Sequence, residues 1–261
     1  MYPLLLEIGG FRLHSYGLAV AAAVLLALWL AGREARRKRF GPAVIEELAL
    51  PVVLAGFLGA RLGYVVGCEP ELLWRDPLGI VAVWRGGLAL HGGLVAGFGA
   101  AIWFCRRRRL AAWRLADAAA PALALGQAVG RLGCFLSGDA YGTPADVPWA
   151  VTFTNPAALA PLGVPLHPVQ LYEAGLDLVL LAVLWGTRRH PAFEGRQFVL
   201  WAGGYALIRV VTETFRGDRV ELGLGLSLLQ AVSLAVLWAA VAAGAVLSAR
   251  RIITSNRETD G

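Results

Sequence analysis

Seven apolar segments, each about twenty residues long, restrict this chain to a small set of folds. A helix of about 20 apolar residues spans the roughly 30 Å hydrocarbon core of a bilayer. Hydrophobic residues make up 57% of the chain and charged residues 16%, whereas about a quarter of the residues in soluble domains are charged. The sequence therefore predicts an all-α membrane protein with seven transmembrane helices, at residues 16–32, 43–66, 87–105, 115–137, 168–186, 197–215 and 225–249.

The sequence predicts one integral-membrane domain over 1–261, with no separate soluble domain of any size. Residues 1–13 lack the basic start of a cleavable signal peptide, so we expect the first span to direct its own insertion. Residues 67–85 are expected to form an amphipathic arm at the membrane interface. Residues 138–166 are rich in proline and glycine and alternate in polarity at 149–153, which predicts a small, partly β head on the same side.

Basic residues are divided unequally between the two sides of these segments. Sixteen of the 24 lie on one side, five lie on the other, and Arg61, Arg131 and Arg209 lie within segments. Because cytoplasmic loops carry the excess of positive charge, the first side is predicted to be cytoplasmic, with the N-terminus outside and the C-terminus inside. The net charge of +6 then reflects topology and attraction to anionic lipids. The basic runs are short and flank helices, which argues against a nucleic-acid partner.

The stretch GRLGCFLSGDAYG, residues 130–142, places a permanently charged arginine near the end of an apolar segment. A guanidinium in hydrocarbon costs about 2.5–3.5 kcal/mol on insertion scales, so such residues usually have a partner or a task. The surrounding glycines allow a backbone or a ligand to approach closely. Arg131 in this frame suggests a site for phosphate at the depth of the lipid headgroups.

Six of the segments carry polar or charged side chains that are unfavourable in hydrocarbon. These side chains fall in one layer, the outer third of the membrane. This segregation predicts a binding or active site there. Alternatives remain open for single members: Arg209 and Glu213 are four residues apart and are able to neutralise each other, Tyr205 fits an interfacial tyrosine, and Arg61 is able to snorkel to the headgroups. The layer contains Tyr16, Arg61, His91, Arg131, Gln170, Tyr172, Glu173, Tyr205, Arg209 and Glu213.

Buried arginines and a histidine together suit group transfer from a phospholipid. Arginine holds phosphate oxygens at two points and stays charged in a poor solvent. His91 is flanked by glycine pairs, which favour access for a ligand, and its ring is able to take a proton from an incoming nucleophile. No second histidine lies near it and the carboxylates come one per helix, so no metal site is expected. We also expect the chain to use no cofactor. A transporter, which would carry its ionisable groups near the midplane, and a lipid-binding protein without turnover are the competing classes.

Seven short blocks of the sequence stand out, in order along the chain: HSYGL at 14–18, GARLGYV at 60–66, GGLALHGG at 86–93, GRLGCFLSGDAYG at 130–142, HPVQLYE at 167–173, GYALIRVVTETFR at 204–216 and SLLQ at 227–230. With these blocks the chain resembles the prolipoprotein diacylglyceryl transferase family. The resemblance implies transfer of diacylglycerol from phosphatidylglycerol to the lipobox cysteine thiol of prolipoproteins, with release of glycerol phosphate, at the periplasmic side of the bacterial inner membrane. Its partners would be phosphatidylglycerol, prolipoprotein signal peptides and membrane lipids.

The site residues follow from the residue chemistry and from this resemblance together. His91, Arg131 and Arg209 are the predicted catalytic residues. Predicted substrate-binding residues are Tyr16, Arg61, Cys134, Asp139, Gly142, Tyr205 and Glu213.

The chain departs from the family pattern at three positions. Cys134 stands where the family usually has asparagine, Asp139 where it has glutamate, and Ala89 where serine is common. The first change removes an amide donor and acceptor from the site. The departures are compatible with a diverged branch that keeps the reaction, and with a paralogue that binds or transports phospholipid without this transfer. Cys134 is most simply a small packing residue.

Overall fold

The computed structural model describes residues 2–9, 11–81, 87, 89–189, 192–223 and 225–259. Helices dominate these residues, which confirms a mostly helical membrane protein. Within this described part of the chain, five helices are by length and composition apolar enough to cross a bilayer. They are α1 (Ser15–Arg37), α2 (Val44–Cys68), α5 (Ala112–Ser137), α6 (Val169–Thr187) and the part of α8 (Leu228–Thr259) that ends at Arg251.

Two further helices occupy the remaining predicted segments. These are α4 (Leu90–Arg107) and α7 (Arg196–Glu213). Composition alone does not mark α7 as a span, because three of its 18 residues are charged: Arg196, Arg209 and Glu213. Seven membrane spans therefore remain a prediction, although each predicted segment contains a helix.

The chain divides into two compact units. The first comprises Met1–Ala31 with Ala116–Gly261, and the second comprises Gly32–Leu115. The first unit holds α5, α6, α7 and α8 and most of α1. The second holds α2 and α4 with the short helices α3 (Leu72–Arg75) and η1 (Pro77–Val81), which belong to the expected interfacial arm.

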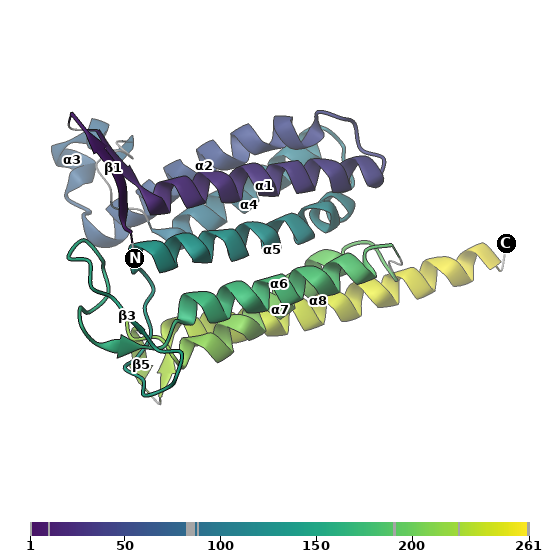
Figure 1. Cartoon of the computed structure of the whole chain (residues 1–261). Coiled ribbons are helices and arrows are strands. Elements are labelled where there is room, and N and C mark those ends of the chain that lie inside the picture. The colour runs from purple at the N-terminus through teal and green to yellow at the C-terminus, as the bar shows by residue number, and fades with distance from the viewer. Residues whose placement is uncertain are drawn as a thin grey trace. The chain divides into compact units, whose positions relative to one another are not determined.

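In the first unit, α6, α7 and α8 run side by side, and the C-terminal part of α8 extends beyond the other two (Figure 1). Ala124 of α5, Leu180 and Leu184 of α6 and Ile208 of α7 form a buried apolar core. At the opposite end from the head, the Asp117 carboxylate accepts the backbone N–H groups of residues 195, 197 and 198 at 2.8–3.2 Å. This carboxylate satisfies the first N–H groups of α7, which no residue next to the helix start caps.

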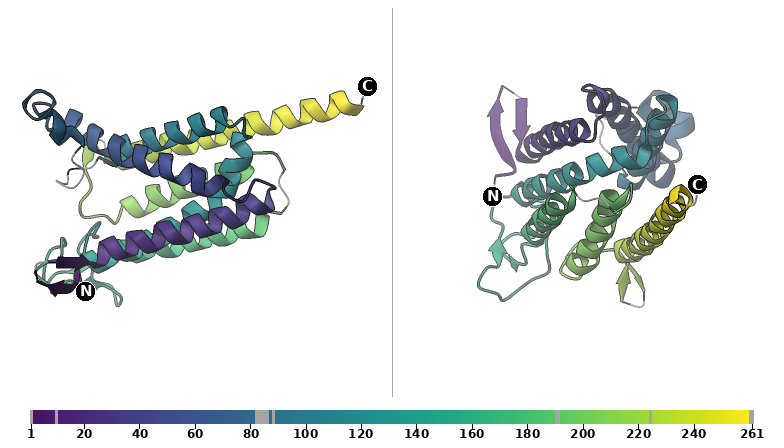
Figure 2. Two further views of the ribbon diagram at one scale, coloured as in Figure 1. Left: turned by 90° about the horizontal axis from the view of Figure 1, so that it is seen from above. Right: turned by 90° about the vertical axis from the view of Figure 1, so that its right-hand side faces the viewer.

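Short β pairs lie at one end of this unit. The hairpin β1 (Leu4–Ile8) with β2 (Phe11–His14) leads directly into α1 (Figure 2) and was not expected from the sequence. Within 138–166, β3 (Val151–Thr152) pairs with β4 (Pro165–Leu166) over a small core of Phe153, Ala160 and Leu166. The third pair joins β5 (Glu221–Gly223) to β6 (Leu226–Ser227) just before α8.

In the second unit, α2 and α4 cross at glycines. A Cβ added to Gly92 would lie 2.2 Å from the carbonyl oxygen of Gly59 and 3.1 Å from Cα of Gly63. Ala89, just before α4, donates its backbone N–H to the carbonyl of Ala60 at 2.8 Å. Close crossing through small residues is a common way for helices to associate in a membrane. These contacts fix the first turns of α4 against α2.

Candidate active site

A chain of buried ion pairs joins α5, α6 and α7 at one end of the first unit. Arg131 near the end of α5 pairs with one carboxylate oxygen of Glu173, and Arg209 pairs with the other. Arg209 also pairs with Glu213, one turn further along α7, at 2.6 Å. We call the set Arg131, Glu173, Arg209 and Glu213 the arginine hub. It contains two positive and two negative groups and is formally neutral.

Antiparallel helix directions explain why these residues meet. Arg131 lies late in α5, Glu173 early in α6 and Arg209 late in α7, so all three lie at the same end of the bundle. Gln170, Glu173 and Asp177 follow one another at spacings of three and four residues, which places them on one face of α6. Arg209 and Glu213 share a face of α7 in the same way. Helices α6 and α7 therefore each contribute a row of polar side chains that points into the bundle.

Hydroxyl groups hold the two carboxylates of the hub. Thr212 donates its hydroxyl to Glu173 at 3.0 Å, and Ser227 donates its hydroxyl to Glu213 at 3.0 Å. Ser227 and Gln230 also bond reciprocally, because each side chain accepts the other residue's backbone N–H at 3.0–3.1 Å. This capping box starts α8. The SLLQ block thus fixes the start of α8 and one carboxylate of the hub together.

The hub is largely buried, and its two arginines differ in exposure. The side chains of Glu173 and Glu213 are 2% and 0% exposed, Arg209 is 8% exposed, and Arg131 is 18% exposed. Removing one partner of such a pair leaves an uncompensated buried charge, which costs about 3–5 kcal/mol. An anion that reaches the hub from outside therefore meets Arg131 first.

Arg216, just beyond α7, adds a third positive charge. Its Nε lies 3.9 Å from Glu213, and its guanidinium bonds Asp218 at 2.6 and 2.9 Å. Burial lowers the pKa of Arg216 and is the largest single influence, but the hydrogen bonds to Asp218 and the attraction of the Asp218 and Glu173 carboxylates together outweigh it, so the pKa is raised above its ordinary value. The positive charge at this edge of the hub is permanent.

The glycine-rich stretch after Arg131 places several predicted residues around it. Tyr16, in the first turn of α1, lies within electrostatic reach of Arg131, Cys134 and Asp139. Cys134 is buried beside Arg131, and its backbone carbonyl accepts the N–H of Asp139 at 3.0 Å. The Asp139 carboxylate in turn accepts the N–H of the next residue at 2.8 Å. The motif therefore turns back on itself next to the arginine.

Tyr205 and Gly142 are also close to this group. Tyr205, one turn before Arg209 on α7, interacts with Arg131 and stacks on Trp201 with an interplanar angle of 5°. Gly142 pairs with Arg216 as an isolated β-bridge, and a Cβ there would lie 2.2 Å from the carbonyl oxygen of His167. The structure therefore gives Gly142 a packing role, because only glycine fits at this crossing.

Arg61 and His91 belong to the second unit. Arg61 is 3% exposed and donates to the backbone carbonyls of Gly79, at 3.0 and 3.3 Å, and Gly87, at 3.3 Å. These bonds tie the arm and the segment before α4 to α2. His91 lies in the first turn of α4, and its side chain lies outside the described part of the structure.

Sequence reasoning placed Glu173 and Gln170 in the polar layer but did not include either among the predicted catalytic and substrate-binding residues. It missed the roles of Asp177, Thr212, Ser227 and Gln230. Two signals were available: polar residues at helical spacing within the apolar segment 168–186, and the S-x-x-Q pattern of a capping box at 227–230. Both patterns place a polar group on a helix face, but neither names its partner on another helix.

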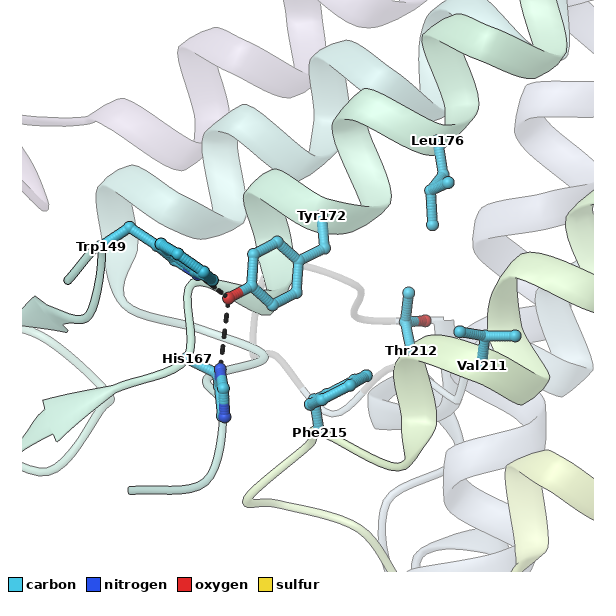
Figure 3. Close-up of a pocket in the computed structure, with 7 residues that line it drawn as sticks. All are labelled: Trp149, His167, Tyr172, Leu176, Val211, Thr212 and Phe215. Atoms are coloured by element: carbon cyan, nitrogen blue, oxygen red, sulfur yellow. Dashed lines mark hydrogen bonds between the residues drawn. The ribbon is translucent and has the colours of Figure 1, made fainter. Parts of the chain in front are cut away.

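An apolar pocket of about 370 Å³ adjoins the hub between α6, α7 and the head. Tyr172 accepts a hydrogen bond from the indole N–H of Trp149 at 2.6 Å, and its hydroxyl lies 3.2 Å from Nδ1 of His167 (Figure 3). Thr212 lines this pocket and also bonds Glu173, so the pocket reaches the edge of the hub. Its lining residues are Trp149, His167, Tyr172, Leu176, Val211, Thr212 and Phe215.

Comparison with known proteins places the chain in a family. A family model described as prolipoprotein diacylglyceryl transferase matches residues 3–246. A relative from Synechococcus elongatus is 40% identical over 242 residues, covering 89% of this chain and 82% of the relative. Another from Rhodospirillum rubrum is 37% identical over 250 residues, covering 92% and 89%. A third, from Trichormus variabilis, is 34% identical over 272 residues, covering 99% and 95%.

All three relatives carry the name phosphatidylglycerol–prolipoprotein diacylglyceryl transferase. The similarity extends over 89–99% of this chain and 82–95% of the three relatives. It confirms the resemblance that the motif blocks indicated. The chain belongs to the prolipoprotein diacylglyceryl transferase family.

Proposed function

We propose that this protein transfers the diacylglyceryl group of phosphatidylglycerol to the lipobox cysteine of prolipoproteins, the first step of lipoprotein maturation. The names of its relatives support the reaction and both substrates. The observation in the structure that carries the proposal is the arginine hub: two guanidinium groups buried at one end of a membrane-embedded bundle. No apolar packing role requires two such charges.

The hub suits a reaction in which charge grows on a phosphate. The thiolate sulfur attacks the glyceryl carbon that bears the phosphate ester, a C–S bond forms, and the C–O bond breaks. The electron pair stays on the phosphate oxygen, and glycerol phosphate leaves. Arg131 and Arg209 stabilise this developing negative charge, since a guanidinium fork matches phosphate oxygens and stays ionised in a buried site.

The other predicted residues supply the base, line the donor lipid or position an arginine. We assign His91 as the base that removes the thiol proton, because imidazole is half-ionised near neutral pH. Tyr16, Cys134, Asp139 and Tyr205 would line the donor lipid around Arg131. Glu213 would hold Arg209 in place.

The reaction also fits the proposed topology. Seven spans with the N-terminus outside would put the ends of α5 and α7, and hence the hub, at the periplasmic side of the inner membrane. Phosphatidylglycerol offers its phosphate at that depth. The ionisable groups collect at helix ends, whereas a transporter would carry them near the midplane.

The direct test combines purified protein, phosphatidylglycerol labelled in its headgroup, and a synthetic lipobox peptide. The expected products are a thioether-linked diacylglyceryl peptide and labelled glycerol phosphate, in equal amounts. A peptide with serine in place of its cysteine is the matched control and should give neither product. Lipid that binds without product would favour the non-catalytic alternative and contradict the proposal.

A further inference from the structure

The side-chain amide of Gln170 lies buried beside the arginine hub. Gln170 lies one turn before Glu173 on the same face of α6 and is 1% exposed. Its Nε2 donates to the backbone carbonyl of Asp139 at 2.7 Å. Within the part of the chain that the structure describes, its Oε1 is buried and has no hydrogen-bond partner. Buried acceptors of this kind call for an explanation.

The orientation of this amide is fixed by chemistry. The Asp139 carbonyl is an acceptor, so the amide must present its NH₂ group there, and the opposite orientation would place two oxygens against each other. The carbonyl itself is held in place, because the segment from Cys134 to Ala140 is bonded internally. Gln170 therefore presents a fixed acceptor between Asp139 and Glu173.

The order of groups along α6 matches the order of groups in a phospholipid. Gln170 lies about 4.5 Å along the helix axis from Glu173, toward the helix start, at 1.5 Å per residue. If Arg131 and Arg209 hold the phosphate at the level of Glu173, the headgroup lies toward Gln170. The diacylglyceryl part then lies toward the apolar middle of α6. A hydroxyl two or three bonds beyond the phosphorus is within reach of Gln170.

We propose that Oε1 of Gln170 accepts a hydrogen bond from a headgroup hydroxyl of phosphatidylglycerol and thereby selects lipids whose headgroup carries one. This inference rests on the proposed function, because it requires the phosphate to lie on the hub. Among the described residues, Asp177 also has buried oxygens without a hydrogen-bond partner. It lies on the other side of Glu173, where a diacylglyceryl group offers esters and alkyl chains, which donate no hydrogen bonds.

The test compares two donor lipids in matched vesicles. Phosphatidylpropanol has the three headgroup carbons of phosphatidylglycerol and no hydroxyl. The unaltered protein should show a higher kcat/KM for phosphatidylglycerol by about tenfold, within the 2- to 12-fold that one neutral hydrogen bond supplies. Gln170→Met has a similar volume and no acceptor amide, and it should bring this ratio to about 1.

A glutamine at the other end of the bundle is the matched control. Gln197 of α7 is fully buried and likewise has an Oε1 without a hydrogen-bond partner among the described residues. Its Nε2 bonds Thr187, away from the hub. Gln197→Met should leave the ratio of the two lipids as in the unaltered protein, so any general effect of losing a buried amide is separated from selection of the headgroup.

A binding measurement separates this inference from the proposed function. Displacement of labelled phosphatidylglycerol by each lipid reports headgroup preference without turnover. An unchanged preference in Gln170→Met, in both turnover and displacement, would overturn the inference and leave the proposed function standing. A preference that is seen in displacement and lost in Gln170→Met, without turnover by the unaltered protein, would support the inference and contradict the transfer reaction.

Discussion

Buried arginines occur in both units of the molecule, but their partners differ. In the second unit, Arg61 donates to the backbone carbonyls of Gly79 and Gly87. In the first unit, Arg131 and Arg209 pair with carboxylates, and one carboxylate, Glu173, serves both. The same side chain at a membrane-embedded position is thus used in two ways.

The partner decides what each arginine is able to do. Backbone carbonyls are fixed by the chain, so these bonds of Arg61 hold two segments to α2. A phosphate is an anion, as a carboxylate is. An incoming phosphate is therefore able to share a guanidinium of the hub with the carboxylates or to replace them. The comparison predicts that changes at the hub remove catalysis, whereas changes at Arg61 alter activity through structure.

The largest effect is expected from the hub. Arg131→Ala and Arg209→Ala should each abolish or nearly abolish transfer. Loss of one donor to a developing negative charge usually costs about 10²–10³-fold, and each change also leaves Glu173 with an uncompensated buried charge. Lysine at either position should rescue poorly, because a point charge does not reproduce a bidentate fork. The measurement is thioether formation from phosphatidylglycerol and a lipobox peptide.

Folding has to be checked in these variants, since Glu173 loses a partner in both. Arg131→Lys keeps the charge and is the fairer comparison. Full-length membrane insertion and an unchanged unfolding temperature in detergent show that the fold is kept. Turnover near that of the unaltered protein in a folded Arg131→Ala would remove this arginine from the mechanism.

The next effect concerns His91. If its imidazole takes the thiol proton, His91→Gln should slow transfer by about 10²–10⁴-fold, the range for a general base. The rate of the variant should also depend less on pH between about 6 and 8, where imidazole titrates. Kinetics across this pH range are the measurement. Slowing with an unchanged pH profile would instead mean that His91 orients the lipid.

Much of the fold and part of the polar cluster could be predicted from local patterns. Among the described residues, each predicted apolar segment contains a long helix, and the pair Arg209 and Glu213 is visible at a spacing of four residues. Glu173 was not identified as the shared partner, because it pairs with Arg209 across 36 residues. Periodicity places a polar group on a helix face but does not specify the helix it meets.

Glycines were the least certain guide to the site. The pairs beside His91 were interpreted as access for a ligand, yet Gly92 lies where α2 and α4 touch. Gly9 and Gly10 separate two short apolar runs, which is a hairpin signal, and Gly9 has a positive φ of 55°. A glycine in the sequence indicates either that another segment packs closely against the backbone or that the backbone turns. Only the position of the neighbouring segments shows which of the two applies.

A moderate effect is expected at the helix crossing of the second unit. Gly92→Ala places a methyl group against the Gly59 carbonyl, and overpacking of this kind costs about 1–3 kcal/mol. We expect a lower unfolding temperature and about tenfold less activity, because the start of α4 must shift. Gly99→Ala on the same helix is the control, since nothing lies within 4 Å of a Cβ there. Equal effects from both would show that the crossing is not tight.

A smaller effect is expected from Arg61→Lys. An ammonium is able to bond one or both carbonyls that Arg61 holds, so activity should fall less than tenfold. Arg131→Lys should lower activity far more. Assays of Arg61→Lys and Arg131→Lys side by side measure the difference between an arginine held by backbone carbonyls and one paired with a carboxylate. Loss of activity as severe as in Arg131→Lys would mean that Arg61 contacts the substrate.

The smallest effect is expected at Cys134, where the chain departs from the family. Its backbone carbonyl, which any residue supplies, accepts the bonds from Ser137 and Asp139. Cys134→Ser should therefore be nearly neutral, and Cys134→Asn should be tolerated or raise activity on phosphatidylglycerol, because an amide offers a better donor and acceptor than a thiol.

The alternative is that Cys134 itself carries the lipid as a covalent intermediate. Both variants would then be inactive, and mass spectrometry would find a diacylglyceryl adduct on Cys134. A thioether is a poor leaving group, so the sulfur would not readily release the lipid to the peptide. The structure also places the thiol in a buried position, 8% exposed, beside Arg131. Active variants without an adduct would show that Cys134 packs beside the arginine, whose charge acts on the phosphate.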